Sequence, residues 1–226
     1  MLTVSSLNVS LAGAKILRDV AFSLTPGATT VLIGRNGAGK TTLLRAVMGL
    51  VPAESGSVLL DGKEMLALPA FARAPAGIGY APEDRRLIPD FTVEENIVLP
   101  GQALKLPQAE IRRRLEKVYA LLPELHVMRA RPGNGVSGGQ GKMVALGRAL
   151  MVAEKLLMLD EPFQGLAPAL ALDYARTLSR LRETMRDLTL LITESSPNLL
   201  KSVADETLLI ERGAVTLQPR ETQSAA

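Results

Sequence analysis

A glycine-rich loop near the amino end of this chain of 226 residues limits its possible folds more than any other segment does. The loop has the sequence GRNGAGKTT. A short apolar run at 29–33 precedes the loop and an apolar segment at 43–50 follows it, so a buried strand leads through the loop into a helix. Both the fixed positions and this context match the phosphate-loop pattern G-x-x-x-x-G-K-[ST]. The loop comprises Gly34, Arg35, Asn36, Gly37, Ala38, Gly39, Lys40, Thr41 and Thr42.

The chemistry of such a loop follows from its residue types. Glycines let the backbone curl, so that successive N–H groups and the amino end of the next helix point at negative charge. We expect Lys40 to reach the β- and γ-phosphates of a nucleotide and the Thr41 hydroxyl to bind Mg²⁺. The loop alone leaves kinases, GTPases and motor ATPases open. The guanine-reading motif Asn-Lys-x-Asp does not occur in the sequence, which disfavours a GTPase.

A pair of carboxylates narrows the choice further. The apolar run at 155–159 predicts a buried strand that ends in Asp160, Glu161 and Pro162. Asp160 stands where a carboxylate that binds Mg²⁺, directly or through water, is expected. Because side chains alternate along a strand, Glu161 points elsewhere than Asp160. We therefore expect Glu161 to face an attacking water as general base or water-positioning residue.

A second anion site is predicted at the start of a helix over 139–151. It consists of Ser137, Gly138, Gly139 and Gln140. We expect Ser137 to cap this helix, while the glycines expose N–H groups and the helix dipole adds partial positive charge. Since this segment belongs to a predicted helical lobe remote from Lys40, the nucleotide bound by a second subunit is its natural ligand.

Strands alternating with helices predict an α/β sheet interrupted by a mainly helical lobe. The sequence patterns place strands at 2–9, 29–33, 57–61, 155–159, 188–193, 207–210 and 214–217, and helices at 107–122, 139–151 and 170–185. We expect one domain, residues 1–226. Its core lobe spans about 1–84 and 147–220, its helical subdomain about 85–146, and a disordered tail 221–226.

Composition excludes several classes of protein. The chain has no cysteine and one histidine, His126, which rules out disulfide scaffolds, Cys-ligated metals and multi-His metal sites. We expect His126 to be a surface or packing residue. The longest uncharged stretch, 20–34, has 15 residues, fewer than the roughly 20 of a membrane span. Aromatic residues make up 3% and the net charge is +3, so we expect no nucleic-acid partner.

The order of these segments resembles that of the ATP-binding subunits of ABC transporters, over nearly the whole chain. The family signature is matched at 136–140, with Val136 where leucine is usual, and the GLAP sequence at 165–168 matches the loop that crosses the dimer interface. Residues 80–96 resemble the segment that links the core to the helical lobe and contacts the membrane subunit. The motifs PEDRR, TVEEN and EPFQGLAP are most similar to those of subunits for branched-chain amino-acid uptake and of related urea/amide importers.

This resemblance implies a P-loop NTPase core sheet with an amino-terminal antiparallel β portion and an inserted helical subdomain. It further implies that two nucleotide-binding subunits, identical or different, sandwich two ATP molecules with Mg²⁺. Each ATP then lies between Lys40 of one chain and the residues Ser137, Gly138, Gly139 and Gln140 of the other. The implied partners are transmembrane permease subunits, and the implied location is cytoplasmic, peripheral on the inner face of the cell membrane.

Three positions depart from the family pattern. Leu11 stands where an aromatic ring usually stacks on adenine, a loss of about 1–3 kcal/mol of binding if nothing replaces it. Glu83 replaces the usual glutamine at the Mg²⁺ and water, a mild change because a carboxylate also binds Mg²⁺. Ser195 replaces the histidine that contacts the γ-phosphate. From Ser195 we predict a chain that binds ATP but hydrolyses it slowly as a symmetric dimer.

Two alternatives stay open at this point. One is a soluble ABC-type ATPase that acts on nucleic acid or translation complexes, which the scarcity of aromatic residues disfavours. The other is a regulatory ATP-binding module with little turnover, which Leu11 and Ser195 favour.

Overall fold

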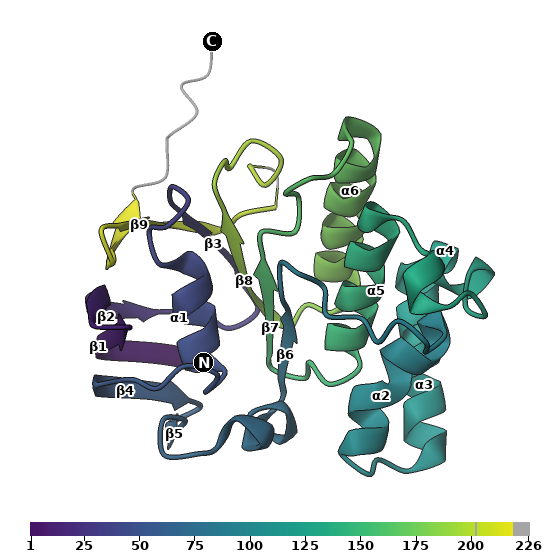
Figure 1. Ribbon diagram of the computed structural model, residues 1–226, viewed down its shortest axis with the longest axis horizontal. Coiled ribbons are helices and arrows are strands. Elements are labelled where there is room, and N and C mark those ends of the chain that lie inside the picture. Colours follow the sequence, from purple (N-terminus) through teal and green to yellow (C-terminus); the bar gives the residue numbers. More distant parts are fainter. Residues whose placement is uncertain (202, 219–226) are drawn as a thin grey trace.

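The computed structural model describes residues 1–201 and 203–218, which form two sheets and a group of helices (Figure 1). The predicted tail, 221–226, lies outside the described residues. The larger sheet contains β3 (Thr29–Ile33), β6 (Ile78–Ala81), β7 (Leu156–Asp160), β8 (Thr189–Glu194), β9 (Glu206–Glu211) and β10 (Ala214–Gln218). Its strand order is β10-β9-β3-β8-β7-β6, and only the edge strand β10 pairs antiparallel.

The smaller sheet is antiparallel and comes mainly from the amino end of the chain. Its strands are β1 (Leu2–Leu11), β2 (Ala14–Ser23), β4 (Ser55–Leu60) and β5 (Lys63–Glu64), in the order β2-β1-β4-β5. Asp61 and Gly62 join β4 to β5 with φ angles of 50° and 77°, as a tight hairpin turn of the I′ type requires. The predicted antiparallel portion and its Asp-Gly hairpin are therefore confirmed.

The larger sheet is apolar on both faces. Because successive side chains point to opposite faces, Leu32 and Leu191 pack on one side, whereas Val31 and Ile192 pack on the other. The first side meets α1 (Lys40–Val47), which lies between the two sheets (Figure 1). Coverage on both faces explains why these strands read as unbroken apolar runs rather than alternating ones.

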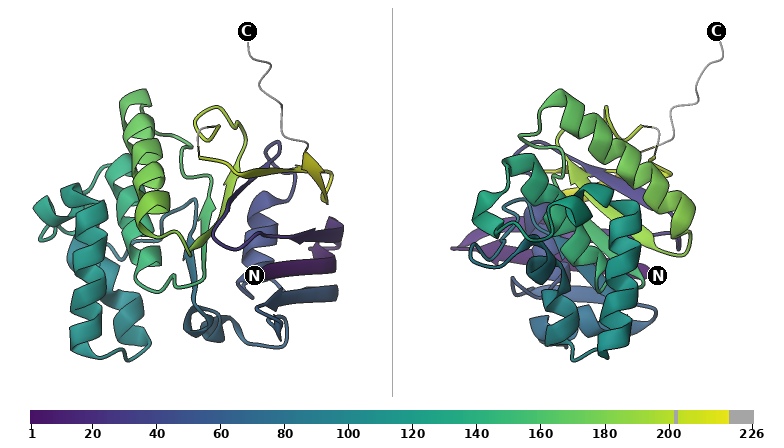
Figure 2. Two further views of the ribbon diagram at one scale, coloured as in Figure 1. Left: turned by 180° about the vertical axis from the view of Figure 1, so that it is seen from behind. Right: turned by 90° about the vertical axis from the view of Figure 1, so that its right-hand side faces the viewer.

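The remaining α-helices share the apolar cluster on the second side of the larger sheet, and the one at 138–150 lies directly against β6 and β7. These helices are α2 (Val93–Ala103), α3 (Gln108–Leu121), α4 (Pro123–Val127), α5 (Gly138–Leu150) and α6 (Pro168–Thr184). The first four lie between β6 and β7 in the chain and form the predicted helical insertion, which stands at one end of the molecule (Figure 2). Short 3₁₀ turns occur at Ala70–Ala72, Ala74–Ala76 and Gly133–Gly135. The exact division into a core lobe and a helical subdomain stays a prediction.

The segment between core and insertion is shorter than the sequence suggested. Residues 80–96 resembled a linker, but β6 runs to Ala81 and α2 begins at Val93, so the connection is 82–92. A capping box between Thr92 and Glu95 starts α2. Because proline is disfavoured inside helices, Pro100 weakens the sequence signal for this helix. In the described part of the chain, no helix has the length and apolar character needed to cross a membrane.

Candidate functional site

Three neighbouring parallel strands end at the same edge of the larger sheet. The loop 34–39 follows β3, Ser195 follows β8, and Glu161 follows β7. These strands are adjacent in the order β3-β8-β7, so the sheet brings together residues far apart in the sequence. Open α/β sheets bind their ligands at this carboxyl edge.

The glycine-rich loop fits between β3 and α1 only with glycines at two positions. A Cβ at Gly34 would lie 2.6 Å from both the carbonyl oxygen and Cγ2 of Ile210. Gly39 has a φ of 111°, in the backbone region that residues other than glycine avoid. The loop so formed delivers Lys40 and Thr41 as the first two residues of α1, at the positive end of the helix dipole.

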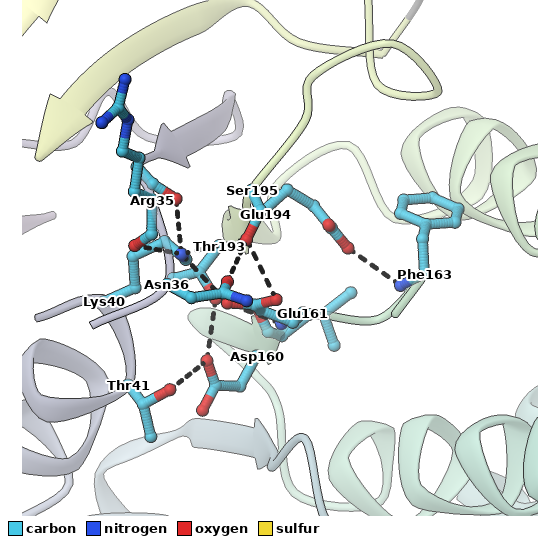
Figure 3. A network of polar contacts seen from close by, with 12 residues as sticks. Arg35, Asn36, Lys40, Thr41, Asp160, Glu161, Phe163, Thr193, Glu194 and Ser195 are labelled. Atoms are coloured by element: carbon cyan, nitrogen blue, oxygen red, sulfur yellow. Dashed lines mark hydrogen bonds and ion pairs between the residues drawn. The ribbon is translucent and has the colours of Figure 1, made fainter. Parts of the chain in front are cut away.

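The Lys40 ammonium is 3% exposed and lies at the centre of the site (Figure 3). Its Nζ donates to the carbonyl oxygens of Gly34 and Arg35, at 2.6 Å and 3.1 Å. It also forms an ion pair of 3.0 Å with Oε1 of Glu161. Since a buried ammonium needs an opposite charge and several acceptors, these contacts account for its position.

Asp160 lies beside Thr41 and is 2% exposed. Its Oδ1 accepts hydrogen bonds from Thr41 Oγ1 at 3.1 Å and Thr193 Oγ1 at 2.8 Å, and its Oδ2 accepts one from the Tyr80 hydroxyl at 3.1 Å. Burial raises the pKa of Asp160, and the three hydrogen bonds oppose that rise. The structure thus places the two predicted Mg²⁺ ligands, Thr41 and Asp160, in direct contact.

Glu83 reaches the same site from the segment 82–92. With the Gln164 amide oriented so that its nitrogen faces the carboxylates, that nitrogen donates to Glu83 Oε1 at 2.5 Å and to Glu161 Oε2 at 3.2 Å. Burial raises the pKa of Glu83, and the nearby carboxylates of Glu161 and Asp160 raise it further. An oxygen-only set of Thr41, Asp160 and Glu83 has the chemistry that Mg²⁺ prefers.

Ser195 joins the glycine-rich loop to the carboxylates. Its Oγ donates to Asn36 Oδ1 at 2.8 Å, and lies 3.3 Å from both Lys40 Nζ and Glu161 Oε2 (Figure 3). The preceding residue, Glu194, accepts a hydrogen bond from the Phe163 backbone N–H at 2.9 Å. Burial raises the pKa of Glu194 to about 7. The structure therefore places Ser195 beside Lys40, while its predicted effect on ATP hydrolysis stays a prediction.

The second predicted anion site stands apart from this cluster. Ser137 caps α5 as expected: its Oγ accepts from the Gln140 N–H, and its own N–H donates to Gln140 Oε1. A Cβ on Gly139 would lie 2.7 Å from Cδ1 of Leu170. Among the contacts described for residues 1–201 and 203–218, none joins 137–140 to Lys40.

Two further predicted residues lie at the surface. Leu11 ends β1, pairs with Ala14 and is 38% exposed. Its role beside adenine stays a prediction. His126 is exposed on α4, and its ring contacts the edge of the Tyr119 ring at 4.9 Å between centroids. His126 is therefore the surface and packing residue that its position in the sequence predicted.

Comparison with known proteins decides the family. The sequence model described as ABC transporter matches residues 17–164 of this chain. The chain belongs to the ABC transporter family. It carries the ATP-binding domain of that family, whose members are ATPases.

Curated relatives match almost the whole chain. The high-affinity branched-chain amino acid transport ATP-binding protein BraG of Pseudomonas aeruginosa is 33% identical, over 96% of this chain and 91% of its own. The lipopolysaccharide export system ATP-binding protein LptB of Escherichia coli is 32% identical, over 94% and 87%. The solved structure of a nucleotide-free ATP-binding cassette from an ABC transporter has a TM-score of 0.82 at 26% identity, over 95% and 89% of the two chains.

Sequence reasoning missed several polar residues of the site. Tyr80 and Thr193 contribute hydroxyls to Asp160, and Gln164 bridges two carboxylates. Thr193 stands directly opposite Asp160 in the pairing of β8 with β7. A sequence that reveals both strands does not by itself reveal this register. Lys142, on α5, was also missed.

Proposed function

We propose that this ABC-family chain hydrolyses ATP to energise an importer of branched-chain amino acids or related polar solutes. The convergence of Lys40, Thr41, Asp160 and Glu161 at the carboxyl edge of one sheet is the observation that carries the proposal. A buried ammonium, a hydroxyl and two carboxylates are the groups that bind a triphosphate with its metal and orient a water molecule.

Each residue of the site has a role in this proposal that follows from its chemistry. Lys40 and the N–H groups of 34–42 bind the phosphates, while Thr41, Asp160 and Glu83 hold Mg²⁺. When bound, Mg²⁺ neutralises phosphate charge and acts as a Lewis acid. Glu161 accepts a proton from the attacking water or orients it. Leu11 lies against the adenine ring.

A second chain completes each site in this proposal. Residues 137–140 provide helix N-terminal N–H groups to the nucleotide that the partner subunit binds. Ser137 and Gly138 are exposed, which leaves this helix end open to a neighbouring subunit. Whether that partner is identical or different, the pair forms two ATP sites.

The transported solute is proposed from relatives. Similarity to BraG supports branched-chain amino acids, whereas LptB, which is about equally similar, belongs to an export system. The PEDRR and TVEEN motifs of the chain favour import of branched-chain amino acids. We place the permease subunits against 82–92, where Phe91 is 37% exposed, and the whole chain on the cytoplasmic side of the membrane.

Ser195 supports a second candidate, a regulatory or soluble ATP-binding subunit with slow turnover. Its short, uncharged hydroxyl is already shared among Asn36, Lys40 and Glu161. It supplies less positive charge to a leaving phosphate than an imidazolium does.

ATP hydrolysis by purified variants tests both candidates. We expect Lys40→Ala to abolish binding and hydrolysis, and Glu161→Gln to retain binding while hydrolysis falls at least a hundredfold. Ser195→His raises turnover if the incomplete site limits it. Hydrolysis that survives Glu161→Gln would refute the assigned base. Co-purification with permease subunits supports the transporter, and salt-sensitive retention on nucleic acid would contradict it.

A further inference from the structure

The backbone of Glu161 is held in an unusual conformation. Its φ is +44°, in the left-handed region that residues other than glycine rarely adopt. Such a conformation persists only where the surroundings fix it. On one side β8 does so, because the Glu161 N–H lies 3.1 Å from both the carbonyl oxygen and Oγ1 of Thr193.

The carbonyl of the same residue, which belongs to the next peptide group, is held from the helical insertion. Lys142 Nζ donates to the Glu161 carbonyl oxygen at 2.5 Å. Lys142 stands about one turn into α5, two residues after the end of the segment 137–140. A lysine of the insertion thus reaches across to the strand end that bears the catalytic carboxylate.

Negative charge surrounds this lysine. Burial lowers the pKa of Lys142, and the carboxylates of Glu194, Glu83 and Glu161 oppose that drop. Lys142 is therefore a partly buried cation with three carboxylates nearby. Together with Lys40, it offsets the negative charge that gathers at the ends of β7 and β8.

We propose that Lys142 is a positioning residue, which holds the left-handed peptide of Glu161 and makes the placement of this carboxylate depend on the position of α5. This inference rests on the proposed role of Glu161 in hydrolysis. It adds a link within one chain: the helix that offers 137–140 to the partner's nucleotide also sets the geometry of the general base for its own. A shift of α5 changes both.

Lysine variants of the full chain test this link. We measure kcat and KM with radiolabelled Mg-ATP, which resolves slow turnover, and melting temperature in parallel. Lys142→Met is expected to lower kcat at least tenfold and leave KM within twofold, because the phosphate contacts of Lys40 are untouched. Lys142→Arg keeps the charge and the donor, so it is expected to restore kcat to within threefold of the wild type. Lys117→Met, the same change at an exposed position of α3, is the control and leaves both constants unchanged.

Other outcomes would overturn the inference. If Lys142→Met keeps kcat within twofold of the wild type while Glu161→Gln is inactive, the proposed role of Lys142 is refuted and that of Glu161 is not. A loss of kcat and melting temperature that Lys142→Arg does not restore shows a merely structural residue. Should Lys142→Met not fold, Lys142→Gln replaces it, with the same tenfold loss expected. Hydrolysis that survives Glu161→Gln refutes the proposed base, and Lys142 as its support with it.

Discussion

Replacing Glu194 with glutamine will change how the stability of this chain depends on pH. Burial raises the pKa of Glu194 from 4.5 to about 7, and its side chain is 5% exposed, so solvent screens it little. Between those pH values the folded chain keeps a proton that the unfolded chain has lost. The free energy of unfolding therefore falls as pH rises through this window. This rise in the pKa corresponds to about 3 kcal/mol of unfolding free energy.

Glutamine removes the titration and keeps an acceptor for the Phe163 N–H. Urea denaturation, followed by circular dichroism at about pH 4.5 and about pH 8, measures the effect. We expect the wild type to lose about 3 kcal/mol more stability between these pH values than Glu194→Gln. Glu116→Gln removes an exposed carboxylate on α3 and serves as the control, which should follow the wild type. Parallel curves for wild type and Glu194→Gln would show that Glu194 is ionised in the fold, and would refute the reasoning.

Three other substitutions have expected outcomes. Gly34→Ala places a Cβ 2.6 Å from Ile210 atoms, so we expect loss of nucleotide binding in a fluorescent-ATP titration. Thr193→Val leaves Asp160 Oδ1 and the Glu161 N–H each short of a partner and should cost about 1–3 kcal/mol in urea denaturation; an unchanged midpoint would contradict it. Leu157→Ala leaves a cavity at a fully buried position and should lower the unfolding free energy by about 2–5 kcal/mol in the same assay. A smaller loss would show that neighbouring side chains move in to fill the cavity.

Much of the fold could be predicted because strong local patterns carry it. The glycine-rich loop between a strand and a helix, and the apolar run that ends at Asp160, each follow from short-range chemistry. In the structure that second strand is Leu156–Asp160, so it begins and ends one residue later than predicted. The capping of α5 by Ser137 was likewise predictable, because a serine followed three residues later by glutamine forms a capping box.

The parts that were missed depend on contacts distant in the sequence. Strand β2 lacks regular alternation, since its burial is set by its neighbours β1 and β10 rather than by its own pattern. Glu83 and Gln164 come together only when the segment 82–92 folds over the end of β7. The left-handed conformation of Glu161, and the lysine that supports it, have no sequence signal at all.

Mixing two inactive variants tests the central claim, that each ATP is bound and hydrolysed between two chains. Lys40→Ala removes the phosphate-binding lysine, and Gly138→Asp places negative charge at an exposed helix start, where a Cβ has room. Each variant alone should be inactive. Since half of the dimers in an equal mixture carry one intact site of two, we expect about a quarter of wild-type hydrolysis. A mixture no more active than its separate components, or an active Gly138→Asp chain, would contradict the claim.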